Sequence, residues 1–177
     1  HFALILATIV ALIQGVLPLT GTYLPSRSLQ ITLQSLARPM AILQFVLVAL
    51  SFAALATAFL TNDFSVTYVA QHSNSLLPKP YQFAAVWGGH EGSLLLWVLM
   101  LALWSMAVAL FSKSLPLDMV ARVLSVLGLI SVGFLLFILA TSSPFERLLP
   151  AALDGRDLNP LLQDPGLVIH PPMLYMG

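Results

Sequence analysis

The chain has 177 residues, of which 59% are hydrophobic and 8% are charged. Soluble domains carry roughly 25% charged residues, so this composition excludes a soluble globular domain and predicts that much of the apolar surface faces lipid. Seven basic and seven acidic residues give zero net charge, which offers no electrostatic basis for binding nucleic acid. The chain has no cysteine, which excludes disulfides and thiolate metal sites in it.

A helix that spans a bilayer needs about 20 predominantly apolar residues. Four segments meet this requirement, namely residues 2–19, 39–60, 93–111 and 119–140. The first three contain no charged side chain, and the fourth contains only Arg122, which lies close enough to the helix end to reach the interface. The sequence therefore predicts an all-α fold, a polytopic transmembrane bundle of about four spanning helices that forms one membrane domain over residues 1–177.

The connections between these segments predict an orientation. The short turn 112–118 makes the third and fourth helices an antiparallel hairpin, whereas residues 60–92 are too polar to span. Basic residues are densest in the short connections on one side of the membrane, at Arg27, Arg38, Lys113 and Arg122. The positive-inside rule places that side in the cytoplasm. The N-terminus and two external loops, residues 60–92 and the tail from 141, are then outside.

Three of the four histidines, His72, His90 and His170, fall in these two external loops. Neutral imidazole is the commonest metal ligand and a frequent haem ligand, so a one-sided set of imidazoles favours metal or haem chemistry. The alternative for each of them is a solvated loop side chain. His72, in a run of polar residues, is interpreted as a loop residue and nothing more.

His170 is the strongest candidate ligand. Pro171 and Pro172 follow it, and proline restricts both itself and the preceding residue, which predicts a stiff, extended backbone at His170. An imidazole positioned on such a segment loses little entropy when it coordinates a metal. The alternative is a helix that starts here with proline in its first positions. Met173 and Met176 could contact a haem, although a role in core filling is the more ordinary one.

His90 lies in the run from Trp87 to Ser93, Trp-Gly-Gly-His-Glu-Gly-Ser, directly before the third predicted helix. The glycines permit a turn and the close approach of a flat ligand, and Glu91 is favoured near a helix N-terminus. The alternative is a loop-to-helix junction with Ser93 as N-cap. Trp97 and Trp104, seven residues apart on one helix face, indicate packing or lipid contact.

Three runs resemble the CcmF family, the haem-lyase membrane subunits of bacterial cytochrome c maturation. They are residues 69–74 (Val-Ala-Gln-His-Ser-Asn), residues 85–97 around Trp87-Gly-Gly-His90, and residues 159–177, which contain His170-Pro-Pro-Met-Leu-Tyr175. The Ala37-Arg-Pro39 entry to the second predicted helix is also similar. The resemblance extends over essentially the whole chain and stops just before the tryptophan-rich WWD segment, so we expect an N-terminal part of a longer polytopic protein.

The resemblance implies a multi-pass protein of the bacterial inner membrane, with its histidine-bearing loops in the periplasm. It implies that haem is received from the chaperone CcmE and attached to the CXXCH motif of apocytochrome c, with CcmH and CcmI handling the thiols, and that the cofactor is haem b. By motif, His170 corresponds to an external axial ligand of the haem iron, with Pro171 and Pro172 positioning it. His90 and Trp87 are weaker cofactor-binding candidates, and the remaining ligands are expected outside this chain.

Two other functions remain open at this point. One is a membrane transporter or channel unit, which would be expected to show polar or broken helices near the midplane of the bilayer. The other is a non-catalytic scaffold for a cytochrome-assembly complex, in which the imidazole of His170 would be dispensable.

Overall fold

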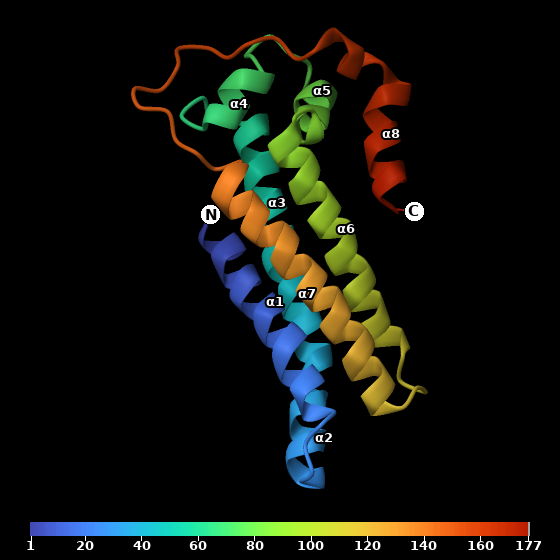
Figure 1. The fold of residues 1–177 in the computed structure, drawn as a ribbon. Helices are drawn as coiled ribbons and strands as arrows, with labels where there is room; N and C mark the ends of the chain where they lie inside the picture. The colour runs from blue at the N-terminus through green and yellow to red at the C-terminus, as the bar shows by residue number, and fades with distance from the viewer. Residues whose placement is uncertain (177) are drawn as a thin grey trace. The chain divides into compact units, whose positions relative to one another are not determined.

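The structure is a computed structural model, and it describes residues 1–176. Gly177, the last residue of the predicted membrane domain, lies outside the described residues. In chain order the elements are α1 (Phe2–Gly21), α2 (Arg27–Ser35), α3 (Ala37–Leu60), α4 (Thr67–His72), α5 (Lys79–Ala84), the 3-10 turn η1 (Ala85–Trp87), α6 (His90–Phe111), α7 (Leu117–Thr141), η2 (Pro160–Gln163) and α8 (Pro165–Met176) (Figure 1).

The predicted all-α fold with four spanning helices is confirmed. Within the described part of the chain, four stretches are long and apolar enough to cross a membrane: α1, α2 with α3, α6 and α7. The predicted bounds differ from the helix ends by at most three residues, as at the start of α6, which is His90 instead of Ser93. Pro39 lies in the first turn of α3, where its missing N–H leaves no helical bond unmade.

The short helices α2, α4 and α5 were not predicted. The segment between the first two spans contains α2, in which Leu29 and Leu33 lie four residues apart on one face. A Cβ built on Gly21, at the end of α1, would lie 2.8 Å from the Cβ of Leu33. Glycine at this position therefore allows α1 and α2 to pack closely.

The chain divides into two compact units. Unit 1 comprises His1–Leu50 and Val98–Phe137, and unit 2 comprises Ser51–Trp97 with the residues from Ile138 onward. The long helices α3, α6 and α7 each contribute one part to either unit. All three candidate histidines belong to unit 2.

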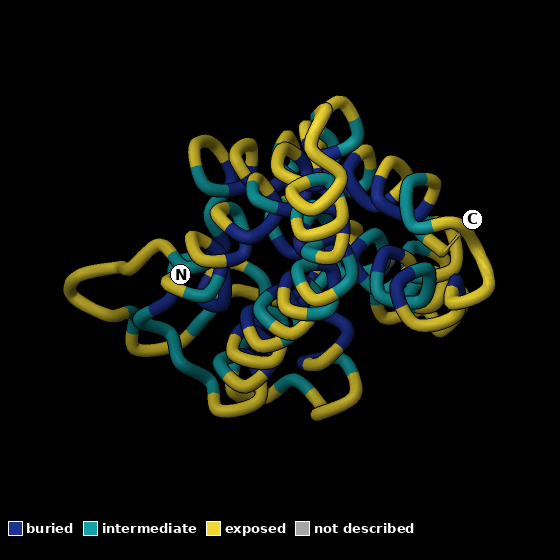
Figure 2. Tube along the Cα trace, turned by 90° about the horizontal axis from the view of Figure 1, so that it is seen from below, coloured by how far each residue is buried: buried dark blue, intermediate teal, exposed yellow. Residues whose placement is uncertain are grey.

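Unit 1 is built from small side chains. Its buried cluster draws on α3, α6 and α7 and consists of Ala37, Ala41, Ala109, Val120, Ala121 and Leu124. Small residues let helix backbones approach closely, which is the main route to helix packing within lipid, where burial of apolar surface supplies little driving force. In Figure 2 the buried stretches (dark blue) lie on the inner sides of the helices and the exposed stretches (yellow) on their outer sides.

Close approach and two hydrogen bonds join α1 to α7 within unit 1. The side-chain amide of Gln14 donates to the carbonyl of Leu124 at 2.8 Å, and the hydroxyl of Ser125 donates to the carbonyl of Gln14 at 3.2 Å. A Cβ on Gly128 would lie 3.0 Å from the backbone nitrogen of Gly15. These two glycines therefore mark the crossing point of the two helices.

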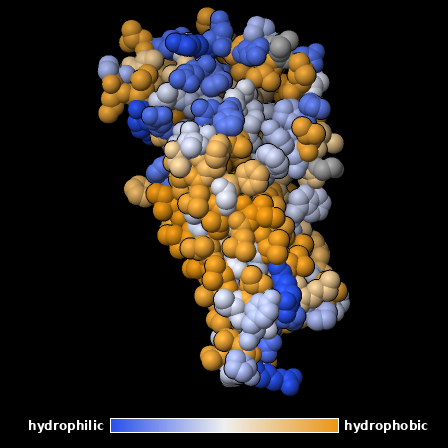
Figure 3. All heavy atoms as spheres, in the orientation of Figure 1, coloured by the Kyte–Doolittle hydropathy of each residue, from blue (hydrophilic) through white to orange (hydrophobic). Residues whose placement is uncertain are grey.

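The outward faces of the long helices are apolar. Large hydrophobic side chains are exposed on each of them, for example Ile9 at 50%, Leu50 at 57%, Trp104 at 50% and Leu136 at 53%. Figure 3 shows this as an apolar surface on the long helices, with hydrophilic residues gathered at the connections and helix ends. A soluble protein rarely exposes so extended an apolar surface, and a multi-pass membrane protein requires it.

Candidate functional site

The helix that carries His170, α8, is attached to unit 2 along one side only. Within α8 four residues are half-buried, and they recur at helical spacing: Val168, Pro171, Pro172 and Tyr175. The other described residues of α8 are exposed, and none is fully buried. Side chains three, four and seven residues apart share one helix face, so these four residues form the attached face of α8.

Two aromatic side chains from outside α8 contact this attached face. The indole Nε1–H of Trp87 donates to the backbone carbonyl of Val168 at 3.0 Å. The ring of Trp97 stacks on Tyr175, with ring centroids 5.6 Å apart and planes inclined by 11°. Both contacts lie within unit 2, and Figure 1 shows α8 running beside the first turns of α6.

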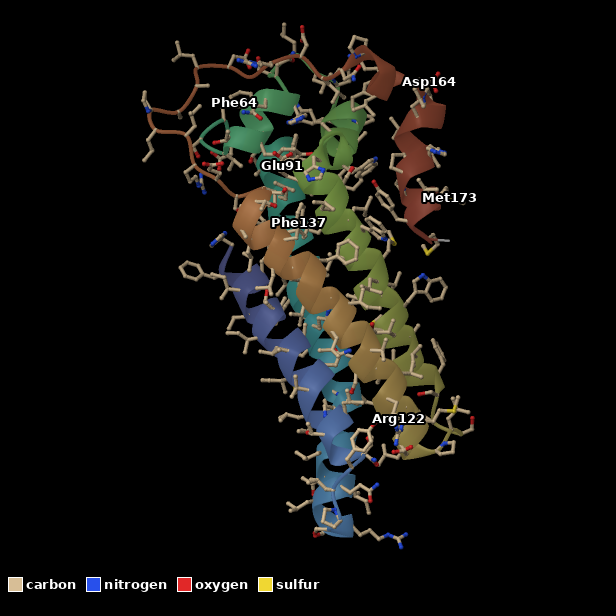
Figure 4. The ribbon with its side chains drawn as sticks, viewed as in Figure 1. Phe64, Glu91, Arg122, Phe137, Asp164 and Met173 are labelled. Atoms are coloured by element: carbon tan, nitrogen blue, oxygen red, sulfur yellow. The ribbon has the colours of Figure 1, made fainter. Side chains whose placement is uncertain are left out.

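His170 lies on the opposite, outer face of α8. At 100° per residue it is turned away from the attached face, next to Leu167, Met173 and Leu174. Met173 is 66% exposed and Leu174 is 64% exposed. The outer face of α8 thus carries one imidazole among exposed apolar side chains. The prediction that Met173 fills a core is wrong, because its side chain is exposed. Figure 4 shows Asp164 at the beginning of α8 and Met173 near its end.

The expectation of an extended backbone at His170 is wrong. His170, Pro171 and Pro172 all lie inside α8, which begins at Pro165. The carboxylate of Asp164 accepts from the amides of Gly166 and Leu167 at 2.8 and 3.2 Å and so caps the helix start. Proline inside a helix is tolerated where another donor satisfies the freed carbonyl, and Trp87 does this at Val168.

The run from Trp87 to Ser93, which leads into α6, is hydrogen-bonded to the buried side chain of Tyr68. Tyr68 of α4 donates its hydroxyl to the carbonyl of Val86 at 3.1 Å and accepts from the amide of Gly89 at 2.9 Å. Burial raises the pKa of Tyr68 well above its ordinary value. A Cβ on Gly92 would lie 1.7 Å from the carbonyl oxygen of Val86. The glycine is therefore required by close backbone approach.

His72 was interpreted as a plain loop residue, and this is wrong. It is the last residue of α4 and is half-buried. Its Nδ1 lies 3.0 Å from the carbonyl oxygen of Tyr68, and its ring centroid lies 4.5 Å from that of Tyr68. A Cβ on Gly89 would lie 2.6 Å from the Nε2 of His72. His72 therefore lies at the end of a helix and packs against the turn that precedes α6.

The junction before α6 differs in detail from the expectation. His90 is the first residue of α6, and Glu91 lies in its first turn, as predicted. Ser93 is not the N-cap, because it lies inside the helix and its hydroxyl donates to the carbonyl of Trp87 at 2.8 Å. The Ser93 hydroxyl thus fixes the backbone of Trp87, whose indole donates to α8.

The segment after α7 is tied to the loop before α4 by polar contacts. The amide of Thr67 donates to the carbonyl of Glu146 at 2.9 Å, and Arg147 pairs with Asp63 at 3.2 Å. The hydroxyl of Ser65 donates to Asp63 at 2.5 Å and, with Arg147, holds the pKa of the Asp63 carboxyl below its ordinary value. These contacts fix the two connecting segments of unit 2 to each other.

Within residues 1–176 no group of three or more His, Cys, Asp or Glu side chains could hold a metal ion. His170 is therefore brought together with neither His72 nor His90 in a metal-binding cluster. On α8 the outer face carries one exposed imidazole, that of His170, among exposed apolar side chains. The chain is a polytopic helical membrane protein in which His170 lies on a helix outside the spanning segments.

The chain belongs to the cytochrome C assembly protein family, whose family model matches residues 87–177. This region contains both the Trp87–Ser93 run and α8. The chain is 59% identical over its whole length to the cytochrome c-type biogenesis protein CcmF of Pseudomonas aeruginosa, and 55% identical over 98% of its length to the CcmF of Escherichia coli.

A solved structure titled cytochrome c heme lyase CcmF matches 98% of the chain with a TM-score of 0.76 at 27% sequence identity. The chain spans 26% of the length of the Pseudomonas and Escherichia relatives and 27% of the chain in that structure. The predicted family is thereby confirmed.

Proposed function

We propose that this chain forms part of a membrane haem lyase of cytochrome c biogenesis, in which His170 is an axial ligand of the haem iron. The observation that carries the proposal is the outer face of α8, where an exposed imidazole is surrounded by exposed apolar side chains. The relatives named for cytochrome c biogenesis and haem lyase support the class of reaction.

The residues of this face fit a haem. Leu167, Met173 and Leu174 offer apolar surface next to the imidazole, which suits a flat, largely apolar ring. Gly166, one turn before His170, adds no side chain, and a Cβ there would meet only the carboxylate of Asp164, at 3.0 Å. Haem, when bound, supplies the iron and the two vinyl groups that become thioether linkages. The role of this chain is to bind, to orient and to donate one nitrogen ligand.

The partners follow from the same chemistry. The chain has no cysteine, which suits a lyase whose thiols come from its substrate, an apocytochrome c with a CXXCH motif. We propose that haem b arrives from the chaperone CcmE, and that CcmH and CcmI present the reduced thiols. The further haem ligands belong to other parts of the complete protein.

The test is removal of the imidazole. In the complete protein, His170→Ala should lower the yield of holocytochrome c at least about tenfold, since even indirect support of a metal ligand is worth 10- to 100-fold. Added imidazole should restore part of the yield, because it replaces the missing ligand. An undiminished yield would refute the ligand role and favour the scaffold alternative.

His90→Ala is the matched control, because it removes an imidazole from the same unit. His90 and Trp87 remain proposed haem contacts of secondary importance, and we expect His90→Ala to reduce the yield less than His170→Ala. Equal losses in both variants would argue against a special role for His170.

We propose further that the protein resides in a bacterial inner membrane with the N-terminus and the loops of unit 2 in the periplasm. The density of basic residues in the short connections supports this orientation. In otherwise cysteine-free protein, Asp157→Cys should react with a membrane-impermeant thiol reagent added to spheroplasts, and Ser114→Cys should not. The reverse pattern would overturn the orientation.

A further inference from the structure

The carbonyl of Val168 lacks its usual donor for a chemical reason. In an α-helix each N–H donates to the carbonyl four residues earlier. Residue 172 is proline, which has no N–H, so no helical bond can reach Val168. The indole Nε1–H of Trp87 lies 3.0 Å from that carbonyl oxygen and donates to it. A side chain 81 positions away therefore supplies the bond that the helix cannot make for itself.

Trp87 is itself held in place before it reaches α8. Its ring meets the edge of Phe83, with centroids 5.4 Å apart and planes inclined by 88°. Its backbone carbonyl accepts from the hydroxyl of Ser93 at 2.8 Å. The indole has a single donor, and these contacts leave that donor directed at Val168.

The second aromatic contact fixes the direction of the helix. Tyr175, which stacks on Trp97, lies seven residues after Val168, or two helical turns along the same face. A helix attached at two points two turns apart can neither swing nor rotate freely. His170 lies between these points on the opposite face, so its orientation is set by the two tryptophans.

We infer that Trp87 is a positioning residue for His170, acting through the carbonyl that Pro172 leaves without a helical donor. The inference rests on the proposed function for the role of His170, but the contact itself does not. None of the described residues of α8 is fully buried. With so little side-chain burial, one hydrogen bond contributes a large share of what holds the helix.

The first test measures hydrogen–deuterium exchange of α8 in the haem-free protein. Hydrogen–deuterium exchange of the complete, haem-free protein in detergent should show residues 165–176 exchanging about fivefold faster in Trp87→Phe, which keeps an aromatic ring and loses the donor, as expected for one lost hydrogen bond. Trp104→Phe, on the same helix as Trp97 but in unit 1, should leave this segment unchanged. Unaltered exchange in Trp87→Phe would overturn the inference.

A double mutant isolates the cause. Pro172→Ala restores an N–H at residue 172, which can then donate to Val168, so the indole becomes redundant. Exchange in Trp87→Phe/Pro172→Ala should return to within about twofold of the Pro172→Ala single variant, in contrast to the fivefold effect in the native background. An undiminished effect of Trp87→Phe in the Pro172→Ala background would show that the indole acts by packing alone and would overturn the assignment.

A haem readout connects the contact to the ligand. In protein loaded with haem, Trp87→Phe should weaken the spectroscopic signature of imidazole ligation, and added imidazole should restore it without slowing exchange of residues 165–176. An unchanged signature in Trp87→Phe, in protein whose signature is lost in His170→Ala, would overturn the positioning role. If His170→Ala itself leaves the signature intact, the proposed function fails, and the exchange experiments still decide whether Trp87 holds α8.

Discussion

In unit 1 the helices meet mainly through alanine and glycine, with a few buried polar side chains such as Gln14, whereas in unit 2 short helices and loops meet mainly through hydroxyl, carboxylate and indole groups. The cluster around Ala41 and Ala109 needs only close backbone approach. Unit 2 instead depends on particular donors and acceptors, such as the Tyr68 hydroxyl between Val86 and Gly89. The difference teaches that the spanning part is specified mainly by residue size, and the part that carries His170 mainly by hydrogen bonding.

The largest effect is expected from a methyl group at Gly92, in the first turn of α6, where the backbone of unit 2 approaches Val86 closely. Gly92→Ala would place a Cβ 1.7 Å from the backbone oxygen of Val86, where only a backbone shift relieves the clash. We expect a loss of about 3 kcal/mol or more in stability, seen as a lower thermal midpoint in detergent.

Gly133→Ala in unit 1 is the matched control. A Cβ on Gly133 would meet nothing within 4 Å, and alanine is favoured over glycine inside a helix by up to about 1 kcal/mol. The control should be neutral or slightly stabilising. Equal losses in the two variants would show that the close approach at Gly92 has no special weight.

A smaller effect is expected from one hydroxyl. Tyr68→Phe keeps the ring contact with Phe59, at 5.4 Å between centroids, but leaves the amide of Gly89 without its acceptor. A buried donor left unpaired costs about 1 to 3 kcal/mol. Tyr81→Phe on α5, whose hydroxyl takes no part in this pair of bonds, should change stability by less than about 0.5 kcal/mol. Comparable effects of both substitutions in thermal unfolding would contradict the role of the Tyr68 hydroxyl.

The smallest effect concerns Asp63, whose side chain is 38% exposed in its pair with Arg147. The folded-state pKa of Asp63 is lowered, first by the Ser65 hydroxyl and then by its other contacts. Its stabilisation is therefore present above the unfolded pKa of about 4 and is lost as pH falls through the lower folded pKa. After allowance for solvent screening, Asp63→Asn should cost less than about 1 kcal/mol at neutral pH. The difference from the native protein should vanish in strong acid, and a constant difference at all pH values would contradict this account.

The same contrast explains how far the sequence could be interpreted. The spanning helices could be predicted because a helix that faces lipid must be mainly apolar. Their ends were predicted to within three residues. The packing of His72 against Gly89 and the helical state of His170 depend on contacts between residues distant in the sequence. Trp87 was singled out only as a weak cofactor contact, although Pro172 signals in the sequence that a carbonyl four residues earlier needs an outside donor.

The bond between Trp87 and α8 ends on a backbone oxygen, and this has an evolutionary consequence. Any amino acid at position 168 offers the same carbonyl, so the identity of Val168 is free to drift. Positions 87 and 172 are not independent in this way, because the indole is needed only while residue 172 is an imino acid. Among related sequences these two positions should change together, with loss of the tryptophan accompanying loss of the proline.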